Sequence, residues 1–286
     1  MSQPPPNVLS FAASDPSCGA GSQADIMTIA NMGCHPLSVI TAITVQDTSG
    51  VHDIFPLRPE WVAHQANAIL NDIPVHVFKL GLLGSDKIIH VIAEILLEYP
   101  QIPVVMDPVL ASGRGDKLAT KAMIDAMRKL LLPRATLLTP NSIEARRLAF
   151  TDARNATSPN YPTLEECAFR LLDMGCKYVL ITGAHENTAQ VINSLFTRDK
   201  KLCTNSWKRL PHSYHGSGCT LASAIAASIA AGQTIHESVL SAQSYTWHAL
   251  KAGFRPGLGQ FIPDRYSHSN NTEKCVNNDN NNIEKS

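Results

Sequence analysis

The sequence of 286 residues predicts an α/β fold in which helices cover both faces of a mainly parallel sheet. Short apolar runs typical of strands alternate with longer segments whose apolar residues recur at helical spacing. Most of these runs are continuous, as expected of strands that are buried on both faces. Polar and glycine-bearing motifs follow the strands, at the edge where ligands bind in such sheets. We therefore expect a three-layer αβα sandwich with a mainly parallel central sheet.

The predicted elements follow one another in a βα rhythm. The first strand is expected at residues 8–13, and a small-residue loop then opens a helix at 23–32. The last predicted helix spans residues 220–231, because this segment lacks Pro and Gly and consists of good helix formers, with Gly232 as the C-cap. Between them we expect strands at 37–45, 75–80, 104–107, 136–139, 178–182, 190–196 and 207–210, and helices at 60–70, 88–97, 120–132, 142–150 and 165–174.

Length and composition favour a single domain at residues 1–266. The Asn-rich tail, residues 267–286, has almost no large apolar side chains and is expected to be disordered. Lys plus Arg and Asp plus Glu both number 24, so nothing favours binding to nucleic acid or to a membrane, and a small molecule is the expected partner. The seven cysteines form neither CxxC pairs nor a zinc-site spacing. With no signal peptide or membrane span apparent, we expect a cytoplasmic protein.

The most informative motif is the run His215-Gly216-Ser217-Gly218-Cys219, directly before the last predicted helix. Gly216 and Gly218 can adopt backbone angles closed to other residues, so the N–H groups of residues 217–219 can converge on one point. That point lies at a helix N-terminus, which favours an anion such as a phosphate. Cys219, in the first turn, is expected to lose its proton easily and then to accept one from a substrate hydroxyl. An ordinary glycine turn with a core cysteine is the competing interpretation.

Other strand ends supply groups for a flat ligand and for a metal. Small side chains in the loop at residues 14–25 would let a flat ligand lie against the backbone, and the glycine spacing does not fit a dinucleotide fingerprint. The amide of Gln46 can donate and accept at once, which suits a ring nitrogen beside an exocyclic amine. Asp107, Asn141 and Glu144 follow later strands, and such oxygen ligands hold hydrated Mg²⁺ on a nucleotide phosphate. Asn141 and Glu144 also fit a capping box.

Together these motifs resemble the ribokinase-like superfamily, and within it the hydroxymethylpyrimidine and phosphomethylpyrimidine kinases of thiamine biosynthesis. The similarity covers roughly residues 8–265, and the segment at 216–219 is the most diagnostic, because those kinases have Cys where most relatives have Asp. The resemblance implies ATP and Mg²⁺ as cofactors. It also implies transfer of the γ-phosphoryl group to 4-amino-5-hydroxymethyl-2-methylpyrimidine, an aminopyrimidine alcohol, and then to the resulting monophosphate.

The resemblance assigns roles to individual residues. Cys219 is the base, and the backbone amides of Gly216, Ser217, Gly218 and Cys219 form an anion hole. The residues expected to contact or enclose the pyrimidine ring are Gln46, Asp25, Ala13, Ala20 and Leu82. The residues expected at the nucleotide are Thr182, Gly183, Arg114 and Asn141. The residues expected to bind the metal are Asp107 and Glu144.

Some positions depart from the family pattern, and other functions stay open. Many relatives have a Lys within the segment that corresponds to residues 111–116 and another at Thr182, so we assign phosphate neutralisation to Arg114 as a hypothesis. A pyridoxal kinase would use the same fold and cofactor, a non-catalytic pyrimidine-binding module fits the missing Lys residues, and a dehydrogenase is a third alternative. We also expect a homodimer, with an exposed apolar strand such as residues 190–196 as a dimer edge.

Overall fold

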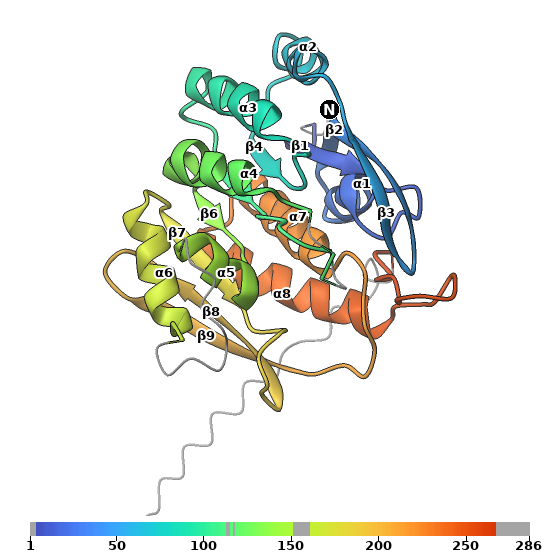
Figure 1. Ribbon diagram of the computed structural model, residues 1–286, viewed down its shortest axis with the longest axis vertical. Helices are drawn as coiled ribbons and strands as arrows, with labels where there is room; N and C mark the ends of the chain where they lie inside the picture. Colours follow the sequence, from blue (N-terminus) through green and yellow to red (C-terminus); the bar gives the residue numbers. More distant parts are fainter. Residues whose placement is uncertain (1–3, 113–114, 117, 151–160, 267–286) are drawn as a thin grey trace, which may run out of the picture.

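The computed structural model contains a nine-stranded sheet with helices on both faces (Figure 1). It describes residues 4–112, 115–116, 118–150 and 161–266. The strands are β1 (Asn7–Ser14), β2 (His35–Asp47), β3 (Gly50–Pro56), β4 (Val77–Leu80), β5 (Val104–Met106), β6 (Leu137–Leu138), β7 (Tyr178–Thr182), β8 (Gln190–Phe196) and β9 (Lys201–Lys208). The helices are α1 (Gly21–Asn31), α2 (Pro59–Leu70), α3 (Asp86–Glu98), α4 (Lys121–Ala126), α5 (Ser142–Ala149), α6 (Leu164–Asp173), α7 (Ser217–Ala230) and α8 (Ile235–Lys251).

The strand order is β3-β2-β1-β4-β5-β6-β7-β8-β9. Strands β2, β1, β4, β5, β6 and β7 pair in parallel, whereas β3, β8 and β9 pair antiparallel at the two sides of the sheet. The prediction of a mainly parallel sheet is therefore confirmed. In the part of the chain that the structure describes, no helix is long and apolar enough to cross a membrane.

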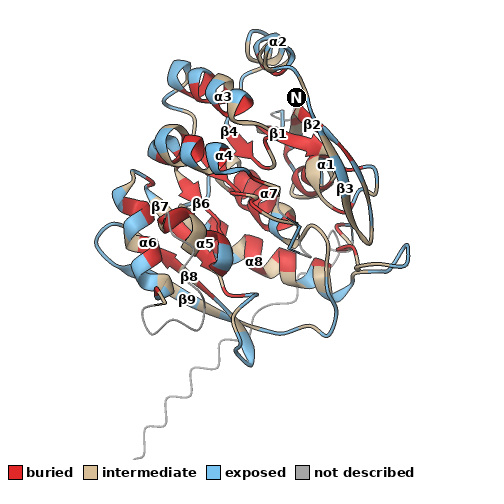
Figure 2. Cartoon of the chain, in the orientation of Figure 1, coloured by how far each residue is buried: buried red, intermediate tan, exposed pale blue. Residues whose placement is uncertain are grey.

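Alternate side chains of the central strands enter two separate cores, one on each face of the sheet. Leu9 and Phe78 belong to the core that is covered by α2, α3, α4, α5 and α6. Their neighbours Val8 and Val77 belong to the core formed with α1, α7 and α8. Figure 2 shows the buried residues concentrated in the strands and along α7. Burial on both faces explains why these strands appear in the sequence as continuous apolar runs.

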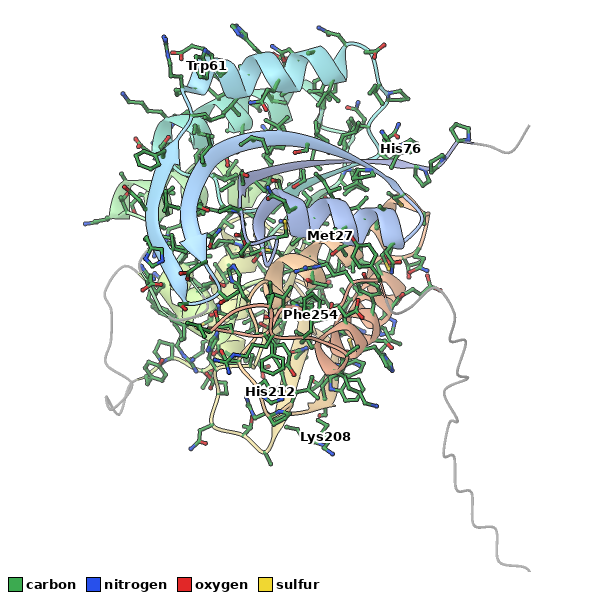
Figure 3. All side chains as sticks on the ribbon, turned by 90° about the vertical axis from the view of Figure 1, so that its right-hand side faces the viewer. Met27, Trp61, His76, Lys208, His212 and Phe254 are labelled. Carbon is green, nitrogen blue, oxygen red and sulfur yellow. The ribbon has the colours of Figure 1, made fainter. Side chains whose placement is uncertain are left out.

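Two elements were not predicted, and each has a physical reason. Strand β3 pairs only with β2, in a curved ribbon beside α1 (Figure 3), and its exposed residues include Asp53, so it has no apolar run. Helix α8 begins at a capping box in which Thr234 and Glu237 hydrogen-bond with each other's backbone N–H groups. The Thr-x-x-Glu spacing is visible in the sequence and could have revealed this helix.

The last strands also differ from the prediction. A strand was expected at residues 207–210, but β9 begins earlier, at Lys201, and ends at Lys208. Because β9 pairs with β8, residues 190–196 are hydrogen-bonded on both sides, and the expectation that they form a dimer edge is wrong. The edge strands are β3 and β9. Strand β9 alternates between exposed and partly buried residues, which hides it from a search for apolar runs.

Candidate active site

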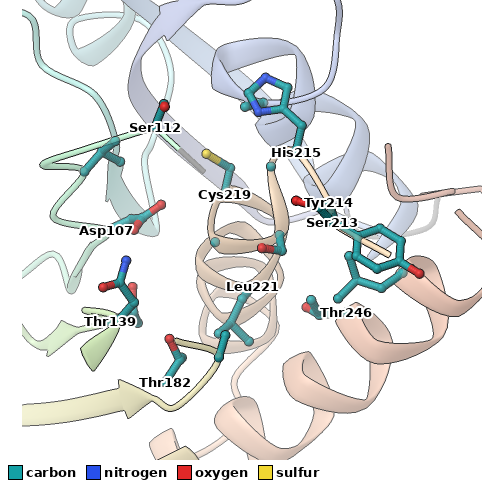
Figure 4. Close-up of a pocket in the computed structure, with 18 of the residues that line it drawn as sticks. Asp107, Ser112, Thr139, Thr182, Ser213, Tyr214, His215, Cys219, Leu221 and Thr246 are labelled. Carbon is teal, nitrogen blue, oxygen red and sulfur yellow. The ribbon is translucent and has the colours of Figure 1, made fainter. Parts of the chain in front are cut away.

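A cavity of about 560 Å³ lies at the carboxyl ends of the parallel strands. Its lining includes residues at or just after β1, β2, β4, β5 and β7, such as Ala13, Gln46, Leu82, Asp107 and Thr182. The N-terminus of α7 faces these strand ends, and Figure 4 shows Cys219 at that end of the helix, between Asp107 and His215. The structure therefore brings together the motifs that the sequence places at separate strand ends.

The loop before α7 has the geometry of an anion cradle. Gly216 is the N-cap of α7, and its φ of 82° lies in the left-handed region that favours glycine. The first-turn N–H groups of residues 217–219 have no carbonyl partner within the helix, because a helix leaves its first donors free. Gly218 has ordinary helical angles, so the expectation of unusual angles is wrong for this glycine. Its missing side chain instead leaves room beside Asp107, since a Cβ would lie 3.6 Å from Oδ2.

The surroundings of Cys219 favour the protonated thiol over the thiolate. Burial raises the pKa of the Cys219 thiol to about 12, although the charge of Lys79 acts in the opposite direction. The expectation of an acidic thiol is therefore wrong, because the helix N-terminus and Lys79 together do not outweigh the loss of water. The thiol also hydrogen-bonds with Asp107. At neutral pH the site thus contains a neutral thiol next to a carboxyl group.

Asp107 and Glu144 form a buried pair of carboxyl groups, each 6% exposed. Burial raises the pKa of Asp107 to about 6, against the attraction of Lys79. Burial and the charge of Asp107 raise the pKa of Glu144 to about 8. The Glu144 carboxylate accepts hydrogen bonds from the backbone N–H groups of Leu110, at 3.2 Å, and Asn141, at 3.0 Å.

These carboxyl groups fit Mg²⁺. Two neighbouring carboxylates that repel each other are stabilised by a divalent cation between them. The described residues contain no group of three or more His, Cys, Asp or Glu side chains that could hold a metal. Mg²⁺ usually binds one or two protein carboxylates and takes its other ligands from water and substrate phosphates, so two carboxyl groups could hold it.

At the expected nucleotide end, Asn141 and Thr182 line the cavity. The Asn141 side chain accepts from the backbone N–H groups of Ile143 and Glu144, both at 3.0 Å, so the predicted capping box is present. Gly183 lies behind Thr182, where its N–H donates to the Asn193 side chain at 3.1 Å. Arg114 lies outside the described residues.

At the other end of the cavity, four of the five residues expected around the ring are found in the lining. They are Gln46, Ala13, Ala20 and Leu82. The Gln46 amide donates to the Thr44 hydroxyl at 2.8 Å, which orients the side chain. Asp25, the fifth expected residue, is fully buried beneath the ring site instead of lining it. Its carboxylate accepts from Ser10 and Ser223 and pairs with Lys79.

Lys79 is a cavity residue that sequence reasoning missed. It lies in β4, is fully buried, and its Nζ is 2.8 Å from both carboxylate oxygens of Asp25. Lys79 lines the cavity, and its charge acts on both Cys219 and Asp107. A single Lys inside an otherwise apolar strand is a detectable feature, because a buried charge requires a partner.

Comparison with known protein sequences finds relatives that match most of this chain. The family model for phosphomethylpyrimidine kinase matches residues 15–264. A hydroxymethylpyrimidine/phosphomethylpyrimidine kinase of Streptomyces coelicolor is 37% identical over 259 residues, which cover 89% of this chain and 92% of the relative. The chain spans only 51% of the thiamine biosynthesis bifunctional protein ThiED of Geobacter sulfurreducens, at 37% identity.

Solved structures lead to the same group of enzymes. A pyridoxal kinase from Staphylococcus aureus in complex with pyridoxal has a TM-score of 0.82 and 28% identity, over 94% of this chain and 96% of that chain. A phosphomethylpyrimidine kinase from Clostridium difficile has a TM-score of 0.72 and 32% identity, over 86% of this chain and 99% of that chain. With the family match over most of the chain, these findings show that the protein belongs to the phosphomethylpyrimidine kinase family.

Proposed function

We propose that this chain transfers the γ-phosphoryl group of ATP to 4-amino-5-hydroxymethyl-2-methylpyrimidine and then phosphorylates the resulting monophosphate to the diphosphate. The observation that carries this proposal is one cavity lined by the anion cradle at α7, by Asp107 and Glu144, and by the amide of Gln46. Similarity to kinases named for these two substrates supports it.

Phosphoryl transfer mainly requires positioning of the reactants and neutralisation of charge. We assign the aminopyrimidine to Gln46, whose amide is oriented by Thr44 and offers both a donor and an acceptor. The hydroxymethyl group then faces Cys219. The N–H groups of residues 217–219 stabilise the charge on the transferred phosphoryl group. Thr182 and Asn141 lie on the nucleotide side of the same cavity.

The neutral state of Cys219 determines how it can act on the substrate proton. A protonated thiol accepts a proton from the substrate hydroxyl only while it gives up its own. Asp107 hydrogen-bonds with the thiol and is the carboxylate placed to receive that proton. We therefore assign Cys219 the role of a proton relay from the hydroxyl to Asp107. Asp107 and Glu144 are also the residues that would hold Mg²⁺, which neutralises phosphate charge when bound.

Purified protein should release ADP from Mg-ATP only when the aminopyrimidine alcohol is present, because the hydroxyl is the acceptor. Mass spectrometry of the products should show both the monophosphate and the diphosphate. Pyridoxal is the matched alternative substrate, since solved structures of similar fold are pyridoxal kinases. Faster turnover of pyridoxal would change the substrate assignment, and no turnover of either alcohol would favour a binding module.

Cys219→Ala should lower kcat at least about 100-fold, because removing a proton-transfer group typically costs that much. Cys219→Ser should keep more activity than Cys219→Ala, since a hydroxyl can also relay a proton. Calorimetry should show affinity for the pyrimidine within about threefold of the unaltered protein for both variants. Equal losses in both variants, or a phosphorylated Cys219 during turnover, would contradict the relay.

The Mg²⁺ concentration for half-maximal turnover should fall as the pH rises from 7 to 9. The pKa of Glu144 is raised to about 8, so protons compete with the cation below that pH and release the site above it. Asp107→Asn should raise the required concentration about tenfold or more and flatten this pH dependence. Asp173→Asn, at the exposed end of α6, is the control that should change neither. Full turnover in excess EDTA would rule out the metal site.

We also propose a homodimer that forms through the β2–β3 ribbon. Ile43 and Phe55 are cross-strand partners that are 52% and 54% exposed, and Val45 is 49% exposed on the same face. Light scattering should give twice the 31.0 kDa mass of the chain, and Phe55→Asp should give the single-chain mass. Leu97→Asp, at a residue 52% exposed on α3, should remain dimeric. A single-chain mass for the unaltered protein would refute the dimer.

A further inference from the structure

Arg265 has the largest fully buried side chain in the described chain, with 1% exposure. It lies in the segment after α8, which runs back beside the loop that opens α7. Within this contact the Phe261 carbonyl accepts from the His215 N–H at 2.8 Å, and the Ser213 carbonyl accepts from the Phe261 N–H at 2.9 Å. The segment after α8 therefore lies against the loop of the anion cradle, a contact that none of the motifs at the strand ends predicts.

The guanidinium of Arg265 joins the loop after β1 to the first turn of α7. Its Nη1 donates to the Cys18 carbonyl at 3.3 Å and its Nη2 to the Gly19 carbonyl at 2.5 Å. Its Nε donates to the Thr220 hydroxyl at 3.1 Å, and that hydroxyl donates to the Gly216 carbonyl at 2.8 Å. A Cβ on Gly216 would lie 2.9 Å from Nη2, so the guanidinium is directly behind the cradle.

Arg265 feels the charges of Asp25 and Asp15, but neither carboxylate forms an ion pair with its guanidinium. Among residues 4–112, 115–116, 118–150 and 161–266, no ion pair includes Arg265. The buried Lys79, in contrast, pairs with Asp25. Asp15 lies in the loop after β1, which Arg265 also contacts. Its Oδ2, however, hydrogen-bonds with the His215 ring at 2.9 Å and accepts from the backbone N–H of Ala20 at 2.7 Å. Burial lowers the pKa of Arg265, although the charges of Asp25 and Asp15 act in the opposite direction.

A buried charge without a partner is costly, and a bound anion can supply the missing charge. The cradle formed by residues 216–219 is the anion site beside Arg265. The three hydrogen bonds that the guanidinium donates to Cys18, Gly19 and Thr220 all go to groups of the two segments that shape this site. The guanidinium therefore acts on a phosphate both through its charge and through the loops that it holds.

We propose that Arg265 is a positioning residue of the phosphoryl-transfer site, which holds the loop after β1 against the N-terminus of α7 and places a positive charge behind the transferred phosphoryl group. This inference rests on the proposed kinase function. It adds to the roles of Cys219, Asp107 and Glu144 a residue near the end of the described chain, outside every strand-end motif.

The test compares Arg265→Met and Arg265→Lys with Arg128→Met. Arg128 is a matched control, because its guanidinium also donates to backbone carbonyls, those of Leu148 at 2.8 Å and Arg147 at 2.6 Å. It is mostly buried, pairs with Asp125, and is not in the cavity lining. Melting temperature, kcat, KM for the pyrimidine alcohol and calorimetric affinity for Mg-ATP are measured for each variant.

We expect Arg265→Met to lower kcat about 30-fold, with KM for the alcohol within about threefold, and Arg265→Lys to recover part of kcat. Arg128→Met should lower the melting temperature with little change in kcat. Wild-type kcat and Mg-ATP affinity in both folded Arg265 variants would overturn the proposal, as would equal kcat losses in Arg265→Met and Arg128→Met.

If Arg265→Met does not fold, Arg265→Lys and Thr220→Val take its place, since the latter removes the hydroxyl that accepts from Nε. A kcat lowered at least fivefold in these folded variants supports the proposal, and an unchanged kcat overturns it. If the unaltered protein phosphorylates no alcohol, the proposed function fails by itself. The affinity for Mg-ATP then tests the role of Arg265. At least fivefold weaker binding by Arg265→Met supports the proposal, and unchanged binding overturns it.

Discussion

The loop after β1 and the N-terminus of α7 approach each other so closely that neither Gly19 nor Gly216 has room for a side chain. A Cβ on Gly216 would collide with the Gly19 carbonyl, and one on Gly19 would collide with the His215 ring. The Asp15–His215 contact and the guanidinium of Arg265 hold the two segments together. The proposed phosphate cradle and the proposed ring pocket share this contact, so both depend on it.

Burial, more than motif, determines the charge states in the cavity. A helix N-terminus stabilises a negative charge by about 0.3–1 kcal/mol at exposed sites, which is small compared with the cost of moving a thiolate out of water. The thiol of Cys219 therefore keeps its proton. The same desolvation raises the pKa values of Asp107 and Glu144, whereas Lys79 keeps its charge beneath the site because it pairs with Asp25. The free site is thus ready for cations and anions that arrive with the substrates.

The segment after α8 also contacts the chain near Gln46, the residue proposed to bind the ring. The backbone N–H groups of Gly259 and Gln260 donate to Thr48, at 3.0 and 2.7 Å from its hydroxyl and carbonyl. Thr48 follows Gln46 at the turn of the β2–β3 ribbon. The segment after α8 therefore contacts both the ribbon that carries Gln46 and the loop before α7, at opposite ends of the proposed substrate site.

The sequence by itself determined the fold class and most of the strand-end motifs, because continuous apolar strands, glycine loops and capping residues are local patterns that repeat along the chain. It placed Gln46, Asp107, Glu144 and the α7 loop at one edge, since parallel strands end together. Tertiary structure alone decided what depends on burial and on distant partners. The high pKa of Cys219, the position of Asp25 beneath the site, the Lys79 ion pair and the approach of Arg265 all arise from residues far apart in sequence. Electrostatic free energies depend on the whole surroundings of a group, and no local pattern contains that information.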